Sequence, residues 1–131
     1  MVQKTVLFVC VHNAGRSQMA AGYMQAFSNG KVKVLSAGSA PNDSINPVAV
    51  QVMAEDGIDI ANNQPKVLTN EAVQESDVVI TMGCGDTCPF YPGKRYEDWV
   101  LDDPAGQDIN KVRIIRDQIK AKVEQLLAEM I

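Results

Sequence analysis

The sequence predicts an α/β protein with a small parallel four-stranded sheet flanked by helices on both faces. Apolar runs that suit buried strands alternate with stretches that suit helices, an order that favours right-handed crossovers and parallel pairing. The first run, Thr5 to Val9, is apolar after its first residue, as a central parallel strand should be. A long amphipathic stretch near the end can cover one face of the sheet. With 131 residues, we expect one domain over residues 1–131.

A helix is expected from Ser17 to Phe27, directly behind the first strand. Ser17 is a good capping residue, and Asn29-Gly30 supplies the residue types that end helices in a left-handed conformation. Val32 to Ala37 alternates between apolar and other residues and predicts the second strand, which Gly38 closes.

The second half of the chain predicts three more helices and two more strands. Asn46-Pro47 combines a cap with proline at the first helical position, and the helix that it opens stops at Gly57. A short helix is expected over Asn70 to Ser76, a third strand over Asp77 to Met82, and a last short strand near Tyr96 to Trp99. The final helix, Ile109 to Met130, has apolar residues at helical spacing, namely Val112, Ile115, Ile119, Val123 and Leu126.

Composition and charge exclude several classes of function. Hydrophobic residues make up 46% and charged residues 21%, as in an ordinary globular protein. The formal charge of −4 argues against general binding to nucleic acid or to an anionic membrane. No apolar run is long enough to cross a bilayer, and the first residues lack the features of a signal peptide. We therefore expect a cytoplasmic protein, either a monomer or a homodimer.

Residues 10 to 17 carry the strongest functional signal. They read Cys-Val-His-Asn-Ala-Gly-Arg-Ser and join the first strand to the first helix. The backbone N–H groups of such a loop and the positive end of the following helix dipole can converge on an oxyanion. Arg16 can grip two of its oxygens, and the same positive field favours a nucleophilic thiolate at Cys10. The residues expected to bind the oxyanion are Val11, His12, Asn13, Ala14, Gly15 and Arg16.

Three residues of this loop have expected conformations or partners of their own. Gly15 is expected at positive φ, because a tight loop that turns its amides inward often needs that geometry. Asn13 is another residue type that tolerates the left-handed region. Ser17 either donates a hydrogen bond to the Cys10 thiolate, or caps the helix, or does both.

The segment Asp102-Asp103-Pro104 lies in a polar loop with Gly106 nearby. A carboxylic acid on such a loop can protonate the oxygen that leaves a bound oxyanion, and proline favours an extended conformation at Asp103. An Asp-Pro turn without a chemical role is common, however, and from these residues alone the turn is the favoured interpretation.

Cys84 and Cys88 follow the third predicted strand, so they should lie at the same carboxyl edge of the sheet as Cys10. A permanent disulfide is not expected in a reducing compartment. Three interpretations remain open: a redox relay, loop thiols without function, or a zinc site completed by Cys10 and His12. Zinc is the more serious competitor to the relay, because four soft ligands would be enough for a closed site. Against zinc, the spacing is not Cys-x2-Cys, and Arg16 would add a positive charge beside the cation. We expect no metal.

The chain resembles the low-molecular-weight protein tyrosine phosphatase fold and, more narrowly, the arsenate reductases built on that fold. The resemblance lies first in Val-Leu-Phe-Val-Cys-Val-His-Asn-Ala-Gly-Arg-Ser-Gln-Met-Ala and in Ser-Ala-Gly. It continues in Asp-Val-Val-Ile-Thr-Met with two following cysteines, in Asp-Trp-Val-Leu-Asp-Asp-Pro-Ala-Gly and in Val-Arg-Ile-Ile-Arg-Asp-Gln-Ile. Together these stretches span nearly the whole chain.

The resemblance implies a role for each candidate residue. Cys10 attacks arsenic in an arsenate held by the loop amides and Arg16, and Asp103 assists the departure of a hydroxide. Cys84 then attacks the Cys10 sulfur, which releases arsenite and leaves a Cys10–Cys84 disulfide. Cys88 attacks Cys84 in turn, and thioredoxin reduces the resulting Cys84–Cys88 disulfide. Such an exchange proceeds by thiolate attack and needs loop movement to bring each thiol into reach.

The sequence departs from this family pattern in two respects. Cys84 and Cys88 lie closer together than in the best-known three-cysteine members, which leaves open the order of attack and an alternative in which mycothiol and a mycoredoxin regenerate the enzyme. Some members bind a structural potassium ion through a glutamate on the first helix. Ala21 stands at that position here and leaves only Asn13 and Ser36, so we expect no cofactor. A phosphatase that acts on phosphoesters through the same loop is the other alternative.

Overall fold

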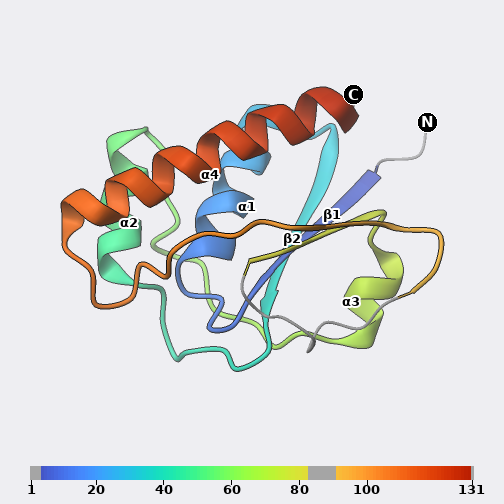
Figure 1. The fold of residues 1–131 in the computed structure, drawn as a ribbon, viewed down its shortest axis with the longest axis horizontal. Coiled ribbons are helices and arrows are strands. Elements are labelled where there is room, and N and C mark those ends of the chain that lie inside the picture. Colours follow the sequence, from blue (N-terminus) through green and yellow to red (C-terminus); the bar gives the residue numbers. More distant parts are fainter. Residues whose placement is uncertain (1–3, 83–90, 131) are drawn as a thin grey trace.

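The computed structural model describes residues 4–82 and 91–130, and it confirms the predicted fold class. A four-stranded parallel sheet carries helices on both faces (Figure 1). The elements in chain order are β1 (Lys4–Cys10), α1 (Arg16–Ser28), β2 (Val32–Gly38), α2 (Pro47–Glu55), α3 (Asn70–Glu75), β3 (Val78–Thr81), β4 (Arg95–Asp98) and α4 (Ile109–Met130).

The strand order β2-β1-β3-β4 places β1 in the interior of the sheet. Val9 of β1 lies opposite Ala37 of β2 and Thr81 of β3. Just beyond β3, the N–H of Met82 donates to the carbonyl of Val9 over 2.7 Å. The carboxyl ends of β1, β2 and β3 therefore meet at one edge, the usual position of a site in such a sheet.

Each face of the sheet has its own hydrophobic cluster. Val6 and Phe8 of β1 face the cluster that contains buried residues of α1, α2 and α4. Leu7 and Val9 point to the opposite face, where Val73 of α3 packs. Figure 1 shows α1, α2 and α4 gathered on one side of the sheet and α3 on the other. The alternation along β1 follows from the two-residue period of a strand buried on both faces.

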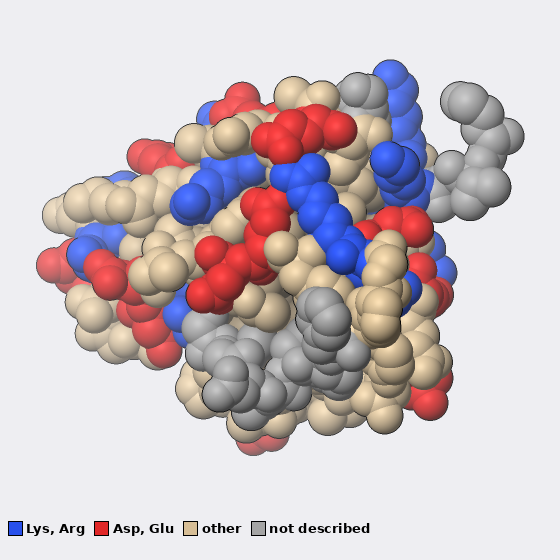
Figure 2. Space-filling model, turned by 45° about the vertical axis from the view of Figure 1, so that its right-hand side comes forward, with Lys and Arg blue, Asp and Glu red and all other residues tan. Residues whose placement is uncertain are grey.

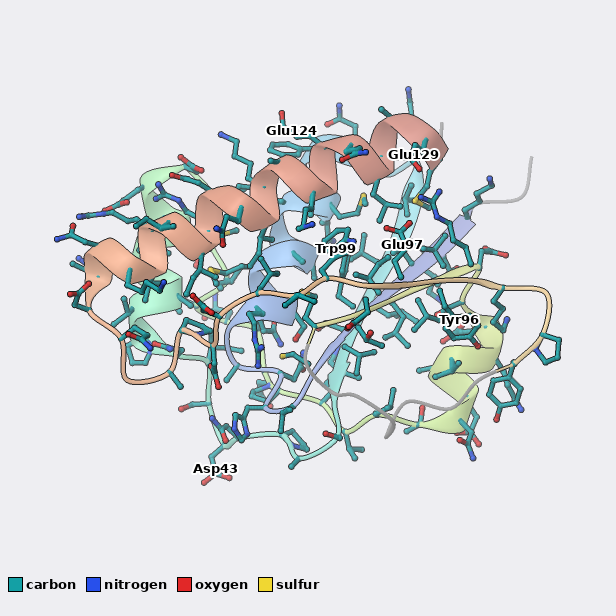
Figure 3. All side chains as sticks on the ribbon, in the orientation of Figure 1. Asp43, Tyr96, Glu97, Trp99, Glu124 and Glu129 are labelled. Carbon is teal, nitrogen blue, oxygen red and sulfur yellow. The ribbon has the colours of Figure 1, made fainter. Side chains whose placement is uncertain are left out.

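The last helix, α4, has the predicted bounds, and all five apolar residues that predicted it are buried. Trp99, just after β4, lies beneath this helix (Figure 3). Its ring centroid is 5.8 Å from that of Phe8, in a tilted arrangement that aromatic pairs favour. The long helix thus covers the sheet and the beginning of the loop that leads to Asp103.

The first helix begins differently from the prediction. Its cap is Gly15, which makes no side-chain capping bond, and α1 starts at Arg16. The expected capping role of Ser17 is therefore wrong: Ser17 is inside the first turn, and its hydroxyl bonds to other side chains. The predicted end is confirmed, since Asn29 and Gly30 have φ of 51° and 81°.

Other boundaries shift by one or two residues. Asn46 caps α2 as predicted by accepting from the N–H of Val48 over 2.9 Å, but the helix ends at Glu55, before Gly57 at φ 76°. The third strand, β3, starts at Val78 and not at Asp77 as predicted. The side chain of Asp77 accepts a hydrogen bond from the N–H of Thr5 over 2.8 Å. The remaining ends differ by a residue or two, as element ends commonly do, at α3 and β4.

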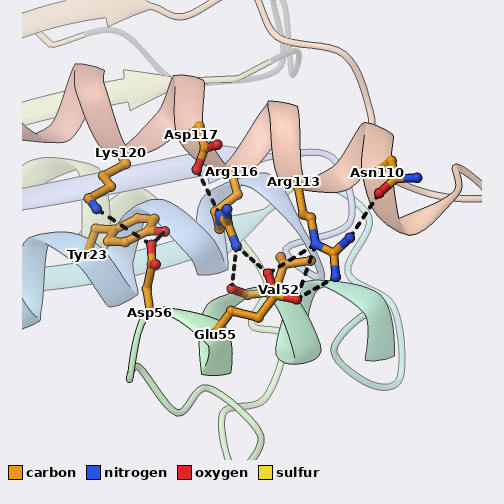
Figure 4. A network of polar contacts seen from close by, with 9 residues as sticks. All are labelled: Tyr23, Val52, Glu55, Asp56, Asn110, Arg113, Arg116, Asp117 and Lys120. Atoms are coloured by element: carbon orange, nitrogen blue, oxygen red, sulfur yellow. Dashed lines mark hydrogen bonds and ion pairs between the residues drawn. The ribbon is translucent and has the colours of Figure 1, made fainter.

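A network of charged side chains fastens α4 to α2 and α1 (Figure 4). Glu55 accepts hydrogen bonds from Arg113 and Arg116, which lower its pKa from 4.5 to about 2. The stability that these bonds contribute is complete above about pH 4.5 and is lost as the pH falls through 2. Next to Glu55, the hydroxyl of Tyr23 donates to Asp56 over 2.6 Å. The pKa of Tyr23 is raised, mainly by burial and to a smaller extent by this hydrogen bond.

Opposite charges are interspersed on the surface. Figure 2 shows Lys and Arg side chains next to Asp and Glu side chains on the face that it presents. Arg95, for example, is paired with both Glu97 and Glu129. Within residues 4–82 and 91–130, the structure holds no helix that combines the length and the apolar character needed to cross a membrane.

Candidate active site

Cys10 is the last residue of β1 and lies at the carboxyl edge of the sheet. Its side chain is buried, with 2% of the residue exposed. The sulfur lies 2.8 Å from Oγ of Ser17 in the first turn of α1. The loop between β1 and α1 therefore folds back over the cysteine and brings the start of the helix to the sulfur.

The carbonyl groups of the loop all point away from its interior, because each accepts a hydrogen bond from outside. Three of them are held by backbone N–H groups of the segment between β2 and α2, and two by α1. The bonds run from Ala40 N to Val11 O (2.8 Å), Asn42 N to His12 O (3.0 Å), Gln18 Nε2 to Asn13 O (3.1 Å), Asn46 N to Ala14 O (2.8 Å) and Met19 N to Gly15 O (2.9 Å).

The outward carbonyls fix the direction of the loop amides. In a trans peptide the C=O of one residue and the N–H of the next point in opposite directions, and the described chain has no cis peptide bond. The N–H groups of residues 12–16 therefore point into the loop, where they meet the N-terminus of α1. Five inward amides and a helix dipole form a site for an anion. This pattern does not orient the N–H of Val11, which is also among the residues expected to bind.

Gly38 lies against the loop at the end of β2. A Cβ at this position would be 2.6 Å from the carbonyl oxygen of Val11 and 2.9 Å from the backbone nitrogen of Asn13. Real Cβ atoms essentially never come so near to backbone atoms, and the carbonyl of Val11 is itself held by a hydrogen bond from the N–H of Ala40. Only glycine lets the loop pack against β2 in this way.

Gly38→Ala is therefore expected to destabilise the protein by about 1–3 kcal/mol and to weaken phosphate binding, because the added methyl group pushes the loop away from β2. Urea unfolding and calorimetric titration with phosphate measure the two effects. Ala40→Ser, at an exposed neighbouring position, is the control and should change neither. A Gly38→Ala protein with unchanged stability and phosphate affinity would contradict the close approach.

Gly15 serves a different purpose from the one expected. Its φ is −135°, so the prediction of positive φ is wrong. A Cβ at Gly15 would instead lie 2.7 Å from Cγ of Pro104, which is buried against it. Glycine here lets the loop that carries Asp103 pack directly on the oxyanion loop. Asn13, in contrast, has the expected left-handed conformation, with φ of 49°.

Arg16 is buried at the mouth of the loop and reaches towards the Asp103 loop. Its Nη1 donates to the carbonyl of Leu101 over 3.3 Å, and its Nη2 lies 3.8 Å from Oδ2 of Asp103. The Nε atom is buried and has no hydrogen-bond partner among the described residues. Leaving a buried charged donor unpaired is costly, so this nitrogen needs an acceptor such as an oxyanion.

Asp103 occupies a position that suits both interpretations of its sequence. The side chain is about half exposed, at 48%, and lines the same pocket as Cys10 and Arg16. Its Oδ1 also accepts from the N–H of Ala105 over 3.0 Å, as in an Asp-Pro turn. Asp102 turns instead towards Lys111, 2.8 Å away, and that contact lowers its pKa. The pocket therefore contains one carboxylate, that of Asp103, among its lining residues.

The other candidates are placed less completely. His12 lines the pocket at its rim, with Nδ1 3.2 Å from the carbonyl of Ala40. Cys84 and Cys88 lie outside the described residues. The described chain before them ends at Met82, whose N–H bonds to the residue that precedes Cys10. The last described residue before the two cysteines, Met82, thus lies at the edge of the sheet where Cys10 lies.

Sequence reasoning missed four contributors to this site: Gln18, Gly38, the carbonyl of Leu101, and Pro104 as a packing partner. Gly38, Leu101 and Pro104 lie far from the loop in the sequence, so the spacing within the motif gives no indication that they contact it. Gln18 alone left a local signal, since it is a polar residue between apolar ones on the face of α1 that must be buried.

Comparison with known proteins gives a consistent result. The family described as low molecular weight phosphotyrosine protein phosphatase matches residues 5–131. A glutaredoxin arsenate reductase of Synechocystis sp. is 38% identical over 130 residues, 97% of this chain and 98% of that protein. A solved thioredoxin-dependent arsenate reductase of Corynebacterium glutamicum is 44% identical with a TM-score of 0.87; the match covers 96% of this chain and 61% of that one. An arsenate reductase solved in the phosphate-binding state is 38% identical over 96% and 98% of the chains, with a TM-score of 0.86.

Proposed function

The chain belongs to the low molecular weight phosphotyrosine protein phosphatase family, and we propose that within this family it acts as an arsenate reductase. The enzyme reduces arsenate to arsenite with electrons from thiols. Its relatives named as arsenate reductases match nearly the whole chain at 36–39% identity. Phosphate and arsenate share their tetrahedral shape and charge, which explains how one loop serves a family of phosphatases and this reaction.

The observation that carries the proposal is the unpaired Nε of Arg16. This buried donor, the inward amides of residues 12–16 and the Cys10 sulfur all line or border one small pocket. A tetrahedral oxyanion in that pocket supplies the acceptor that Arg16 lacks and sits above the sulfur. Asp103 and the carbonyl of Leu101 already face the two Nη atoms of Arg16, so Nε is the nitrogen that the oxyanion would satisfy. The site is thus suited to bind a doubly charged oxyanion next to a nucleophile.

The first chemical step joins Cys10 to arsenic. The Cys10 thiolate forms an S–As bond and one As–O bond breaks. The leaving hydroxyl group departs as water after it takes a proton from Asp103. The loop amides and Arg16 hold the remaining oxygens and stabilise the charge that develops on them.

The reduction follows from a relay of thiols. The Cys84 thiolate attacks the Cys10 sulfur: an S–S bond forms, the S–As bond breaks, and its electron pair stays on arsenic, which leaves as arsenite. The Cys88 thiolate then attacks Cys84, restores the Cys10 thiolate and leaves a Cys84–Cys88 disulfide. Two thiols have supplied the two electrons that arsenic gained.

Thioredoxin is the proposed reductant of the final disulfide, because the similar arsenate reductase of Corynebacterium glutamicum is described as thioredoxin-dependent. A glutaredoxin, as in the name of the Synechocystis relative, and mycothiol with mycoredoxin are the alternatives. A coupled assay with each of these reductants in turn identifies the one that sustains turnover. The relay needs free thiols between turnovers, which fits the reducing cytoplasm.

Intact mass spectrometry distinguishes this function from a phosphatase. After one turnover with arsenate and no reductant, the relay predicts a protein lighter by two hydrogens, with a disulfide that contains Cys84. A phosphatase that uses Cys10, Arg16 and Asp103 forms no disulfide and leaves Cys84 idle. Weak hydrolysis of phosphoesters is compatible with either function, but an unchanged mass after exposure to arsenate would refute the reductase.

Asp103→Asn is expected to slow the formation of the S–As bond by ~10²- to 10⁴-fold, because the leaving oxygen then lacks its proton donor. Pre-steady-state measurement of arsenate consumption gives this rate, because arsenite is released only in the later attack of Cys84 on Cys10. Asp102→Asn is the matched control: its carboxylate pairs with Lys111 outside the pocket, so its loss should leave the rate within a few-fold of wild type. Equal rates for both variants would show that Asp103 is a turn residue only.

A further inference from the structure

A buried chain of hydrogen bonds leads from Gln18 to Cys10, and no step of the proposed reaction uses Gln18. This residue follows Ser17 in α1 and is almost completely buried. Its Nε2 lies 3.1 Å from both the backbone oxygen and Oδ1 of Asn13, and 3.4 Å from the carbonyl of Gln64. Its Oε1 accepts from Asn63 over 3.4 Å. A buried amide with this many partners holds its neighbours in one arrangement.

A backbone group determines which atoms donate and which accept in this series of hydrogen bonds. The N–H of Lys66 donates to Oδ1 of Asn13 over 2.8 Å. A backbone N–H can only donate, so the amide oxygen of Asn13 must face Lys66. The Nδ2 of Asn13 must then face Ser17, whose Oγ is 2.7 Å away. Gln18 supplies the second donor to the same oxygen and opposes a flip of the Asn13 amide.

The orientation of Asn13 determines the orientation of the Ser17 hydroxyl. Because Nδ2 of Asn13 has only hydrogens to offer, Oγ of Ser17 accepts from it. The hydroxyl proton of Ser17 is left to point at the Cys10 sulfur, 2.8 Å away. A hydrogen bond donated to a thiolate stabilises it, and it is stronger than one between neutral groups.

We propose that Gln18 is a positioning residue for the nucleophile: it locks Asn13 in the orientation that makes Ser17 donate to Cys10. It also holds the backbone oxygen of Asn13 and so keeps that residue in its left-handed conformation. The inference rests on the proposed role of Cys10 as nucleophile. Gln18 itself touches neither the pocket nor the reacting atoms.

The test measures how fast iodoacetamide alkylates Cys10 across a pH range, in the full chain, with peptide mapping to separate Cys10 from Cys84 and Cys88. Gln18→Met removes the donor at similar length. Gln25→Met is the matched control, because Gln25 lies seven residues further along α1, exposed, and has no bond to the loop. Ser17→Ala and the double variant Gln18→Met/Ser17→Ala complete a double-mutant cycle.

Ser17→Ala is expected to slow alkylation near neutral pH by about tenfold and to move the pH profile upwards, since the thiolate loses a donor. Gln18→Met should do the same to a smaller extent, roughly threefold, because Lys66 still holds Oδ1 of Asn13. The double variant should react no more slowly than Ser17→Ala alone. The ionisable side chains that line the pocket, those of Arg16, Asp103 and His12, are unchanged in all four proteins, so their effects on Cys10 cancel in the cycle.

The proposal would be overturned if the decreases in the alkylation rate of the two single variants multiplied in the double variant. It would also be overturned if the pH profile of alkylation for Gln18→Met were identical to that of the wild type. Gln18→Asn, whose shorter amide cannot reach Asn13, is the second variant if the methionine protein does not fold, and the same losses are expected. The readout is chemical modification of Cys10 and involves no arsenate. If the protein failed to reduce arsenate, the cycle would still decide the role of Gln18, so the two failures are distinguishable.

Discussion

Cys10→Ser is expected to abolish arsenate reduction, with a loss on the order of 10⁴-fold or more, because a serine hydroxyl beneath the oxyanion is neither ionised nor able to form a disulfide with Cys84. The sulfur is buried at the end of β1 and points at the first turn of α1, so the change to oxygen is nearly isosteric and leaves the loop in place. The thioredoxin-coupled rate of arsenite formation measures the loss.

The same variant should keep its affinity for oxyanions. The inward amides and Arg16 are the proposed binding contacts, and none of them depends on the sulfur. Calorimetric titration with phosphate is the control: binding within a few-fold of wild type shows that the loop is intact. Turnover by Cys10→Ser at a rate near that of the wild type would mean that another thiol attacks arsenic, and the proposed reaction would have to be abandoned.

The parts of this fold that were predictable from sequence have local causes. Thr5 to Val9 was predictable as a buried strand because a parallel strand covered on both faces is apolar almost throughout, and here only Thr5 is polar. The helix from Ile109 to Met130 buries one face for its whole length, so its apolar residues recur in the sequence with the period of a helix. The loop from Cys10 to Arg16 joins a strand to a helix, an order that brings the N-terminus of the helix close to the cysteine at the end of the strand.

The errors concern residues whose partners are distant in the chain. Ser17 is a residue type that often caps helices, but its hydroxyl is hydrogen-bonded to the side chains of Asn13 and Cys10. Gly15 is a residue type that favours left-handed turns, yet glycine is needed here because Pro104, almost ninety residues away in the chain, packs against it. Gly38 is a residue type that often ends a strand, and in addition the loop packs directly against it. Tertiary contacts of this kind leave no periodicity to detect.

Cys88→Ser is expected to stop the enzyme after a single turnover. Cys10 and Cys84 still reduce one arsenate, but their disulfide then has no internal thiol to resolve it. One equivalent of arsenite per protein should appear in a burst, followed by a steady rate at least ~10²-fold below that of the wild type, set by direct attack of thioredoxin on the buried sulfur of Cys10. Rapid-quench measurement of arsenite gives both numbers.

The trapped species identifies the order of the relay. Peptide mapping of Cys88→Ser after the burst should find Cys10 joined to Cys84, and Cys84→Ser should form a Cys10–Cys88 bond slowly or not at all. The short spacing between the two cysteines makes the reverse order the main competitor. If Cys84→Ser stalled after one arsenite with a Cys10–Cys88 disulfide while Cys88→Ser released no burst of arsenite, Cys84 and Cys88 would exchange roles in the relay.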